Sequence, residues 1–222
     1  MPEPLLPLRL FYGGTFDPFH CGHLAIARHA RHRLGVEVRL MPAADPPHRP
    51  PPGAGAGDRV RMLQLGIEGE PGLVADLREL GRSAPSWTVD TLRELRAGPE
   101  ALEPVALLVG ADSLHGLAGW KEWRELLELT HFVVAARPGL ELGKGLVPEL
   151  HAALEGRWTS EADDLRRSPG GRVFRLEQPL HPVSATQVRR RIGEGGDWRS
   201  LVPPAVADYI ARHGLYAPGR SG

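Results

Sequence analysis

The chain has 222 residues, which suffice for one α/β domain with a full core but are few for two. Its 27 lysines and arginines balance 27 aspartates and glutamates, so the formal net charge is zero. That balance argues against nucleic acid or an anionic membrane as a partner, because both select proteins with a basic excess. The balance does not exclude small anionic substrates, because binding them needs only a local cluster of positive groups.

The single cysteine, Cys21, excludes an internal disulfide and fits a reducing compartment. No apolar run approaches the ~20 residues that a membrane-spanning helix needs. The start of the chain, Met1 to Pro4, lacks the charged region and apolar core of a signal peptide. We therefore expect a cytoplasmic protein.

The first predicted elements form a βαβ unit. Leu8 to Tyr12 is a short apolar run that predicts a strand, and Leu24 to Leu34 places apolar side chains on one helical face. Gly35 can end that helix, and Val36 to Met41 is the next predicted strand. The two strands should be parallel, because a helix connects them.

Between the first strand and helix lies the sequence GGTFDPFHCGH, residues 13–23. A glycine turn before a helix start presents unpaired backbone N–H groups, which bind anions. His20 and His23 stand there and can donate hydrogen bonds to phosphate oxygens. A metal pair is the alternative, but no third ligand with suitable spacing is evident. The segment predicts a phosphate site with chemistry attached, in which Asp17 fits a turn-forming role better than a catalytic one.

Strands and helices continue to alternate through the middle of the chain. Pro42 to Gly57 is predicted to be a loop, with the glycine-rich stretch 53–57 as a flexible connection rather than a phosphate loop. Asp58 should cap a helix that runs to about Gly69, and Ser86 should cap another. Further strands are expected at 73–77, 105–109, 132–136 and 173–176, further helices at 120–129 and 146–154, and a polar loop at 155–171.

Near the end, Ser184 and Gln187 have the spacing of a capping box that opens a helix to about Ile192. Pro204 should start a final helix, with Gly214 after its end. The alternation predicts a single α/β domain over 8–216, a doubly wound Rossmann-like parallel sheet with helices on both faces and C-terminal helices, between loose tails at 1–7 and 217–222. Ligands bind such sheets at the carboxyl ends of the strands, so 13–23, 42–49, 110–113 and 137–139 should share one rim.

Two motifs resemble the signatures of the nucleotidylyltransferase superfamily. Gly13-Gly14-Thr15-Phe16-Asp17-Pro18-x-His20-x-Gly22-His23 is similar to its (T/H)xGH motif, and Ser184-x-Thr186-x-x-Arg189 is similar to its second signature. The chain further resembles the bacterial nicotinate-nucleotide adenylyltransferases from about residue 10 to 216. The supporting stretches are Pro46 to Arg49, Pro85 to Thr88, Gly110 to Leu114, Trp120, and Arg137 to Gly139.

The resemblance implies that ATP and nicotinate mononucleotide are joined to nicotinate adenine dinucleotide and pyrophosphate in NAD biosynthesis. The acceptor phosphate attacks the α-phosphorus of ATP in line. His20 and His23 would donate to the ATP phosphates, with His23 at the α-phosphate, and Arg189 would clamp the β- and γ-phosphates. Mg²⁺ would be held mainly by the ATP phosphates, and no residue of the chain is expected to ligate a metal.

The resemblance also assigns the remaining substrate contacts. ATP would be bound by Gly13, Gly14, Thr15, Phe16, Gly110, Asp112, Ser184 and Thr186. Ser184 and Asp112 could instead only cap helices. The mononucleotide would be bound by His48, Arg49, Thr88, Trp120 and Arg137. Trp120 would stack on the nicotinate ring, although its shared helical face with Trp123 and Leu127 would by itself suggest packing.

Two alternatives remain at this stage. One keeps the chemistry but changes the acceptor to nicotinamide mononucleotide or phosphopantetheine. Pro85 to Thr88 and Trp120 favour an acceptor with a pyridine ring, which argues against phosphopantetheine. The other is a nucleotide- or RNA-binding module of the same fold without turnover, which the intact His20, His23 and Arg189 argue against. The oligomeric state stays open, with a homodimer among the possibilities.

Overall fold

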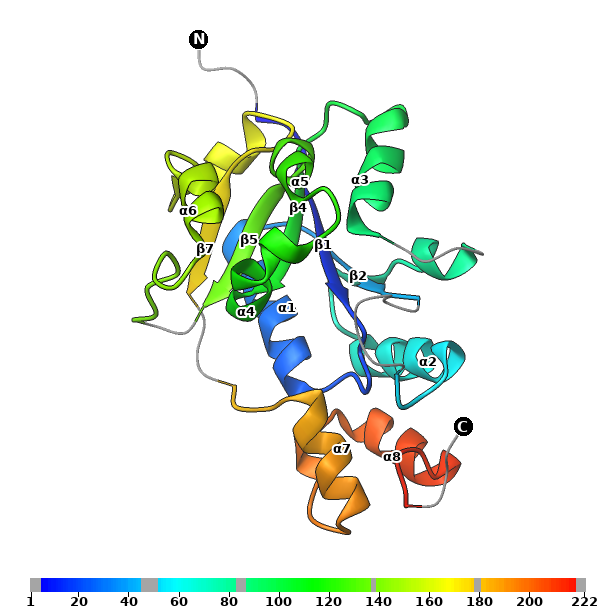
Figure 1. The fold of residues 1–222 in the computed structure, drawn as a ribbon. Helices are drawn as coiled ribbons and strands as arrows, with labels where there is room; N and C mark the ends of the chain where they lie inside the picture. Colours follow the sequence, from blue (N-terminus) through cyan, green and yellow to red (C-terminus); the bar gives the residue numbers. More distant parts are fainter. Residues whose placement is uncertain (1–4, 45–51, 83–86, 137–138, 178–180, 219–222) are drawn as a thin grey trace. The chain divides into compact units, whose positions relative to one another are not determined.

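A computed structural model describes residues 5–44, 52–82, 87–136, 139–177 and 181–218. The strands are β1 Arg9–Gly14, β2 Val38–Pro42, β3 Leu73–Ala75, β4 Val105–Gly110, β5 His131–Ala136, β6 Trp158–Thr159 and β7 Val173–Glu177. The α-helices are α1 Cys21–Leu34, α2 Ala56–Ile67, α3 Thr88–Ala97, α4 Ala111–His115, α5 Trp123–Leu129, α6 Pro148–Leu154, α7 Ala185–Gly193 and α8 Pro204–His213 (Figure 1).

The strands form one seven-stranded sheet in the order β3-β2-β1-β4-β5-β7-β6. The pairings β1–β4, β4–β5, β5–β7 and β6–β7 are all parallel. Strand order that runs outward in both directions from β1 and β4 is that of a doubly wound sheet. The predicted fold class is confirmed.

The chain divides into two compact units. The first comprises the described parts of 1–13, 30–39 and 87–180, and the second those of 14–29, 40–86 and 181–222. None of the described helices has the length and hydropathy that crossing a membrane requires.

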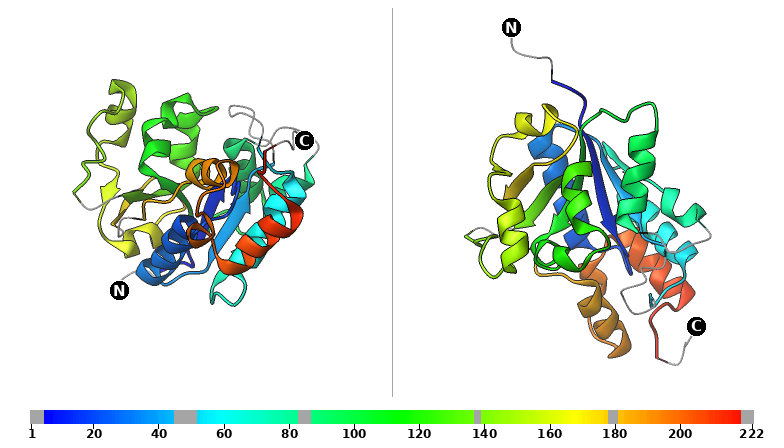
Figure 2. Two further views of the ribbon diagram at one scale, coloured as in Figure 1. Left: turned by 90° about the horizontal axis from the view of Figure 1, so that it is seen from below. Right: turned by 45° about the horizontal axis from the view of Figure 1, so that its top comes forward.

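In the first unit the register brings the ends of three strands to one edge. Tyr12 of β1 pairs with Leu108 of β4, and Gly110 at the end of β4 pairs with Ala135 of β5. The carboxyl ends of these strands therefore share an edge, and α4 begins there directly after Gly110. All six residues of β5 are buried, as expected for a parallel strand covered on both faces. Figure 2 shows the ribbon from two further directions.

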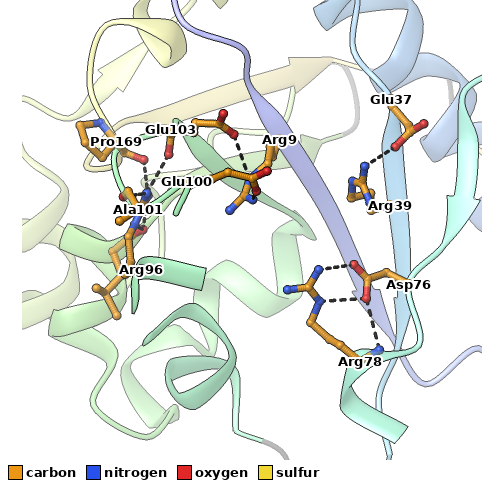
Figure 3. Close-up of polar contacts among 11 residues, drawn as sticks. Arg9, Glu37, Arg39, Asp76, Arg78, Arg96, Glu100, Ala101, Glu103 and Pro169 are labelled. Carbon is orange, nitrogen blue, oxygen red and sulfur yellow. Dashed lines mark hydrogen bonds and ion pairs between the residues drawn. The ribbon is translucent and has the colours of Figure 1, made fainter. Parts of the chain in front are cut away.

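Arg96 on α3 ties several loops of the first unit together. Its guanidinium donates hydrogen bonds of 2.6–2.9 Å to the backbone carbonyls of Leu129, Ala101, Glu103 and Pro169 (Figure 3). One side chain thereby satisfies carbonyls from the end of α5 and from the loops before β4 and β7, which would otherwise lose hydrogen bonds on burial.

The core of the second unit lies among its helices. Met62 of α2, Val188 of α7 and Ile210 of α8 are buried in one apolar cluster. Tyr209 of α8 donates its hydroxyl to Oδ1 of Asp58 on α2 at 2.8 Å. The helices predicted near Ser184 and Pro204 are thus confirmed, and both contribute to the apolar cluster that contains Met62 of α2.

Several predicted helix starts are wrong, for local reasons. α1 begins at Cys21 rather than Leu24, because His20 supplies its cap. Asp58 does not cap α2: it is the third residue of the helix, Gly55 holds the cap position, and the Asp58 carboxylate binds Tyr209 instead. The N-cap of α3 is Trp87, whereas the predicted cap Ser86 lies outside the described residues.

Two predictions in the first unit are also corrected. Trp120 does not belong to α5, because a 3₁₀ turn ends at Trp120 and Glu122 has a φ of 51°, which interrupts a helix. The segment 155–171 is not all loop. It contains β6 and a 3₁₀ turn at Ala162–Arg166, and a strand of two residues is too short to leave a sequence pattern.

Candidate active site

The two histidines of the first motif cap α1 reciprocally. His20 holds the N-cap position, and its carbonyl accepts the Leu24 N–H at 3.2 Å. The backbone N–H of His23 donates to Nδ1 of His20, and that of His20 donates to Nδ1 of His23, both at 3.3 Å. This is the arrangement of a capping box, with two imidazoles in place of the usual Ser and Glu. The three-residue spacing follows from it.

The cap also assigns the protonation of both rings. Because Nδ1 of His20 and of His23 accepts a backbone N–H, the proton of each neutral ring belongs on Nε2. Burial lowers the pKa of His20 to about 4. The pKa of His23 is also lowered well below its ordinary value, first by burial and then by the neighbouring His20. Each histidine is therefore a neutral Nε2–H donor near pH 7.

Aromatic rings enclose this pair. The two imidazoles stack at 3.6 Å between centroids, and His23 lies 5.0 Å from the ring of Phe16 and 5.6 Å from that of Phe19. Phe16 packs against Gly14, where an added Cβ would lie 2.9 Å from the ring. His20 is buried and His23 half-buried, and this partial loss of hydration favours the neutral form of both rings.

Gly22 is required by the same packing. A Cβ there would lie 3.0 Å from the ring of His20 and 3.1 Å from the carbonyl oxygen of Val183. The glycine in the GH pair therefore lets the segment before α7 approach the capping histidines, although glycine inside a helix costs ~1 kcal/mol relative to alanine.

Asp17 joins distant segments of the second unit. Its side chain is 5% exposed and accepts the N–H groups of Gly53 at 2.7 Å and Ala54 at 3.1 Å and the hydroxyl of Tyr216 at 2.6 Å. The structural role that we predicted for this residue is thus supported. The flexible connection predicted at 53–57 is wrong, because its first N–H groups bind Asp17 and its end belongs to α2.

Arg189 of α7 reaches the same point. Its Nη1 donates to the backbone carbonyl of Asp17 at 2.6 Å and lies 3.6 Å from Oδ2 of the carboxylate. The side chain keeps 36% of its surface exposed. The structure thus places Arg189 beside the turn that carries the histidines, as the two motifs together predict.

Ser184 is the N-cap of α7, with Oγ accepting the Gln187 N–H at 3.2 Å. The capping role is confirmed, whereas a contact with phosphate stays a prediction. Ser184 and Thr186 are both exposed at the start of the helix that carries Arg189.

Sequence patterns did not reveal the role of Arg59 on α2. It is the largest fully buried side chain among the described residues. Its guanidinium donates to the carbonyls of Thr15 at 3.0 Å, Ala43 at 2.7 Å and Ala44 at 2.6 Å. Arg59 therefore holds the motif turn against the loop that follows β2. Nothing in its local sequence distinguishes it from a surface arginine on a helix.

The predicted ATP contacts Gly13, Gly110 and Asp112 belong to the first unit. Gly110 and Asp112 are exposed at the edge where β1 and β4 end. Asp112 is the second residue of α4, whose N-cap is Gly110, so the alternative that Asp112 caps this helix is wrong. Its role toward ATP stays a prediction.

The stretches around Thr88 and Trp120 come together in the first unit. Lys121 lies with Nζ 5.6 Å from the centroid of the Trp87 ring and 3.2 Å from the carboxylate of Asp90 on α3. Thr88 and Trp120 are both half-buried. Trp123, not Trp120, fills the core position of α5. The alternative that Trp120 packs in the core rested on a helical face shared with Trp123 and Leu127. Trp120 lies outside α5, so that argument no longer holds.

Three predicted mononucleotide contacts, His48, Arg49 and Arg137, lie outside the described residues. Within the described residues, no three histidine, cysteine, aspartate or glutamate side chains gather as a metal site would require. Cys21, between the histidines, instead points Sγ toward the carbonyl of Ser200 at 4.0 Å.

Comparison with known proteins assigns the class. Residues 11–191 match the cytidylyltransferase-like family, and the chain belongs to it. Its relatives include "probable nicotinate-nucleotide adenylyltransferases". That of Stenotrophomonas maltophilia is 57% identical over 96% of this chain and 98% of its own length. That of Xylella fastidiosa strain M12 is 48% identical over 94% and 96%. Within the family the chain therefore falls among the nicotinate-nucleotide adenylyltransferases.

Solved structures agree on the fold. Nicotinic acid mononucleotide adenylyltransferase of Plasmodium falciparum, complexed with NaAD, has a TM-score of 0.71 at 16% identity, over 95% of this chain and 97% of that one. A putative nicotinate-nucleotide adenylyltransferase of Vibrio parahaemolyticus has a TM-score of 0.63 at 14% identity, over 95% and 96%.

The close packing at Gly22 predicts a contrast between two helical glycines. Gly57 of α2 has nothing within 4 Å of an added Cβ, so Gly57→Ala should stabilise the protein by about 0.5–1 kcal/mol. Gly22→Ala should leave it about 1–3 kcal/mol less stable than Gly57→Ala, because the new methyl group meets His20 and a backbone carbonyl. Urea unfolding measures both, and equal stabilities would contradict the packing described.

Proposed function

We propose that this protein transfers the adenylyl group of ATP to nicotinate mononucleotide, releasing pyrophosphate and forming nicotinate adenine dinucleotide. The observation that carries the chemistry is the reciprocal histidine cap, which presents two neutral Nε2–H donors at a helix N-terminus. The acceptor is taken from relatives up to 57% identical over nearly the whole chain.

The histidines act by electrostatic stabilisation. Negative charge grows on the oxygens of the α-phosphate when the acceptor phosphate attacks and pyrophosphate leaves. Preorganised donors in a water-poor site stabilise that charge without having to reorient. His23, enclosed by Phe16 and Phe19, donates to the α-phosphate, and His20 donates beside it. No general base is needed, since the acceptor phosphate is already anionic.

Arg189 holds the leaving group. Its planar guanidinium suits two phosphate oxygens at once, and its backbone anchor on Asp17 fixes where that fork points. The N–H groups at the start of α7, beside Ser184 and Thr186, extend the anion site. Gly13, Gly14, Thr15 and Phe16 are proposed to bind the triphosphate, and Gly110 and Asp112 are proposed to bind the adenosine.

Mg²⁺ enters with ATP in this proposal. When bound, it neutralises part of the phosphate charge, and hard oxygen ligands from the phosphates and water suffice for its octahedral shell.

For the mononucleotide, Trp120 stacks on the pyridine ring, and backbone N–H groups near Thr88 bind the carboxylate. Two observations support this role. Trp120 is half-buried, and ring stacking needs one open face. Its neighbour Lys121 also contacts Trp87 and Asp90, on either side of Thr88. His48, Arg49 and Arg137 are proposed for the phosphate of the mononucleotide.

The choice of acceptor is tested by steady-state kinetics with the acid and amide mononucleotides. We expect kcat/KM to be at least about 100-fold higher for nicotinate mononucleotide, because a site that pairs backbone donors with a carboxylate leaves them poorly matched to an amide. Phosphopantetheine should not be adenylylated. Equal kcat/KM for acid and amide would reject the acid-specific assignment.

The role of His23 predicts a particular kinetic pattern. His23→Ala should lower kcat by at least about 100-fold while the Kd for ATP changes little, since the donor acts mainly on charge that develops in the transition state. Arg124, which lies over the Trp123 ring and has no role in the proposed chemistry, offers Arg124→Ala as a control. Turnover of His23→Ala close to that of the wild type would remove His23 from the mechanism.

A further inference from the structure

Arg189 is anchored by contacts with Asp17 and Gly53. Its Nη1 binds the Asp17 carbonyl at 2.6 Å and lies 3.6 Å from the Asp17 carboxylate. Its Cδ lies 3.4 Å from the point where a Cβ of Gly53 would stand, and the ring of Tyr216 lies 3.2 Å from the same point. The arginine stem and the tyrosine ring therefore both pack closely on Gly53.

Tyr216 completes this arrangement from beyond the end of α8. Its hydroxyl donates to Oδ1 of Asp17 at 2.6 Å, on the carboxylate whose Oδ2 accepts the Gly53 N–H. Burial, reinforced by the charge of Asp17, raises the pKa of Tyr216 far above its ordinary value. The hydroxyl thus stays protonated and can only be a donor to the carboxylate.

We propose that Tyr216 and Asp17 are positioning residues that hold Arg189 in the orientation in which its remaining N–H groups meet the ATP phosphates. The proposal rests on the function proposed above for Arg189. An arginine side chain has many rotamers, and freezing them on binding reduces affinity. A guanidinium anchored before ATP arrives has already lost that freedom, so more of its interaction energy is expressed as binding and catalysis.

The hydroxyl of Tyr216 can be removed without dismantling the site. In Tyr216→Phe the ring still packs on Gly53, and Oδ1 of Asp17 keeps the Ala54 N–H at 3.1 Å. The variant loses only the hydrogen bond from the Tyr216 hydroxyl to Oδ1 of Asp17, whereas Arg189 lies near the other oxygen, Oδ2. The variant therefore perturbs the orientation of the arginine more than the fold.

The test is a double-mutant cycle of Tyr216→Phe and Arg189→Ala, with kcat/KM for ATP measured on all four proteins. We expect Tyr216→Phe to lower kcat/KM about tenfold in the wild-type background, mostly through KM. In the Arg189→Ala background, Tyr216→Phe should lower kcat/KM less than about twofold, because no arginine is left to position. The same loss in both backgrounds would overturn the proposal.

Tyr209→Phe is the matched control. It also removes a tyrosine hydroxyl from an aspartate, Asp58, in the same unit, so thermal unfolding should detect a comparable loss of stability. Its kcat/KM should equal that of the wild type. A kinetic defect as large as that of Tyr216→Phe would show that general loosening, rather than positioning, is responsible.

Calorimetric binding of inorganic tripolyphosphate separates this inference from the proposed function. The wild-type protein should bind tripolyphosphate, and Tyr216→Phe should bind it about tenfold more weakly. In the Arg189→Ala background, adding Tyr216→Phe should not weaken the binding further. A wild type that binds tripolyphosphate in this pattern but does not adenylylate nicotinate mononucleotide would refute the function and leave the positioning intact. Unchanged binding in Tyr216→Phe would refute the positioning alone.

Discussion

The reciprocal cap between His20 and His23 is the constraint on which the proposed chemistry depends. Nδ1 of each imidazole accepts a backbone N–H at the start of α1, so the same hydrogen bonds set the start of the helix and the orientation of the two proposed catalytic groups. A side chain that only reached toward phosphate would have to be held by something else. Here the helix cap orients it, and Gly22 admits the close approach that this requires.

The buried carboxylate of Asp17 has the complementary task. A charge in such a place is tolerated only when several donors satisfy it, and the adjacent Gly53 and Ala54, Tyr216 and Arg189 do so from three parts of the chain. Breaking any one leaves the others competing for a desolvated anion. This makes Asp17 a point where stability is coupled to the placement of Arg189, the arginine proposed to bind phosphate.

Sequence patterns predicted the features that depend on local rules. The glycine turn, the helix after it, the Ser184 cap and the alternation of strands and helices all follow from turn, capping and periodicity preferences, and family resemblance joined the two motifs. Long-range polar contacts were beyond reach. Nothing around Arg59 or Tyr216 signals a bond to a partner tens of residues away, and Asp58 looked like a cap because its true partner, Tyr209, lies in another helix. Trp120 was misplaced by a helical period that a short turn interrupts.

The central claim is that His20 and His23 of the free enzyme are neutral Nε2–H donors. Nitrogen-15 NMR of histidine-labelled protein, with the two rings assigned through single-substitution variants, tests it most directly. Both residues should give Nε2–H signals that do not titrate between pH 8 and pH 5, since burial lowers the pKa of His20 to about 4 and that of His23 well below its ordinary value. A midpoint near the ordinary value of about 6.5 for either ring, or an Nδ1–H tautomer, would contradict it.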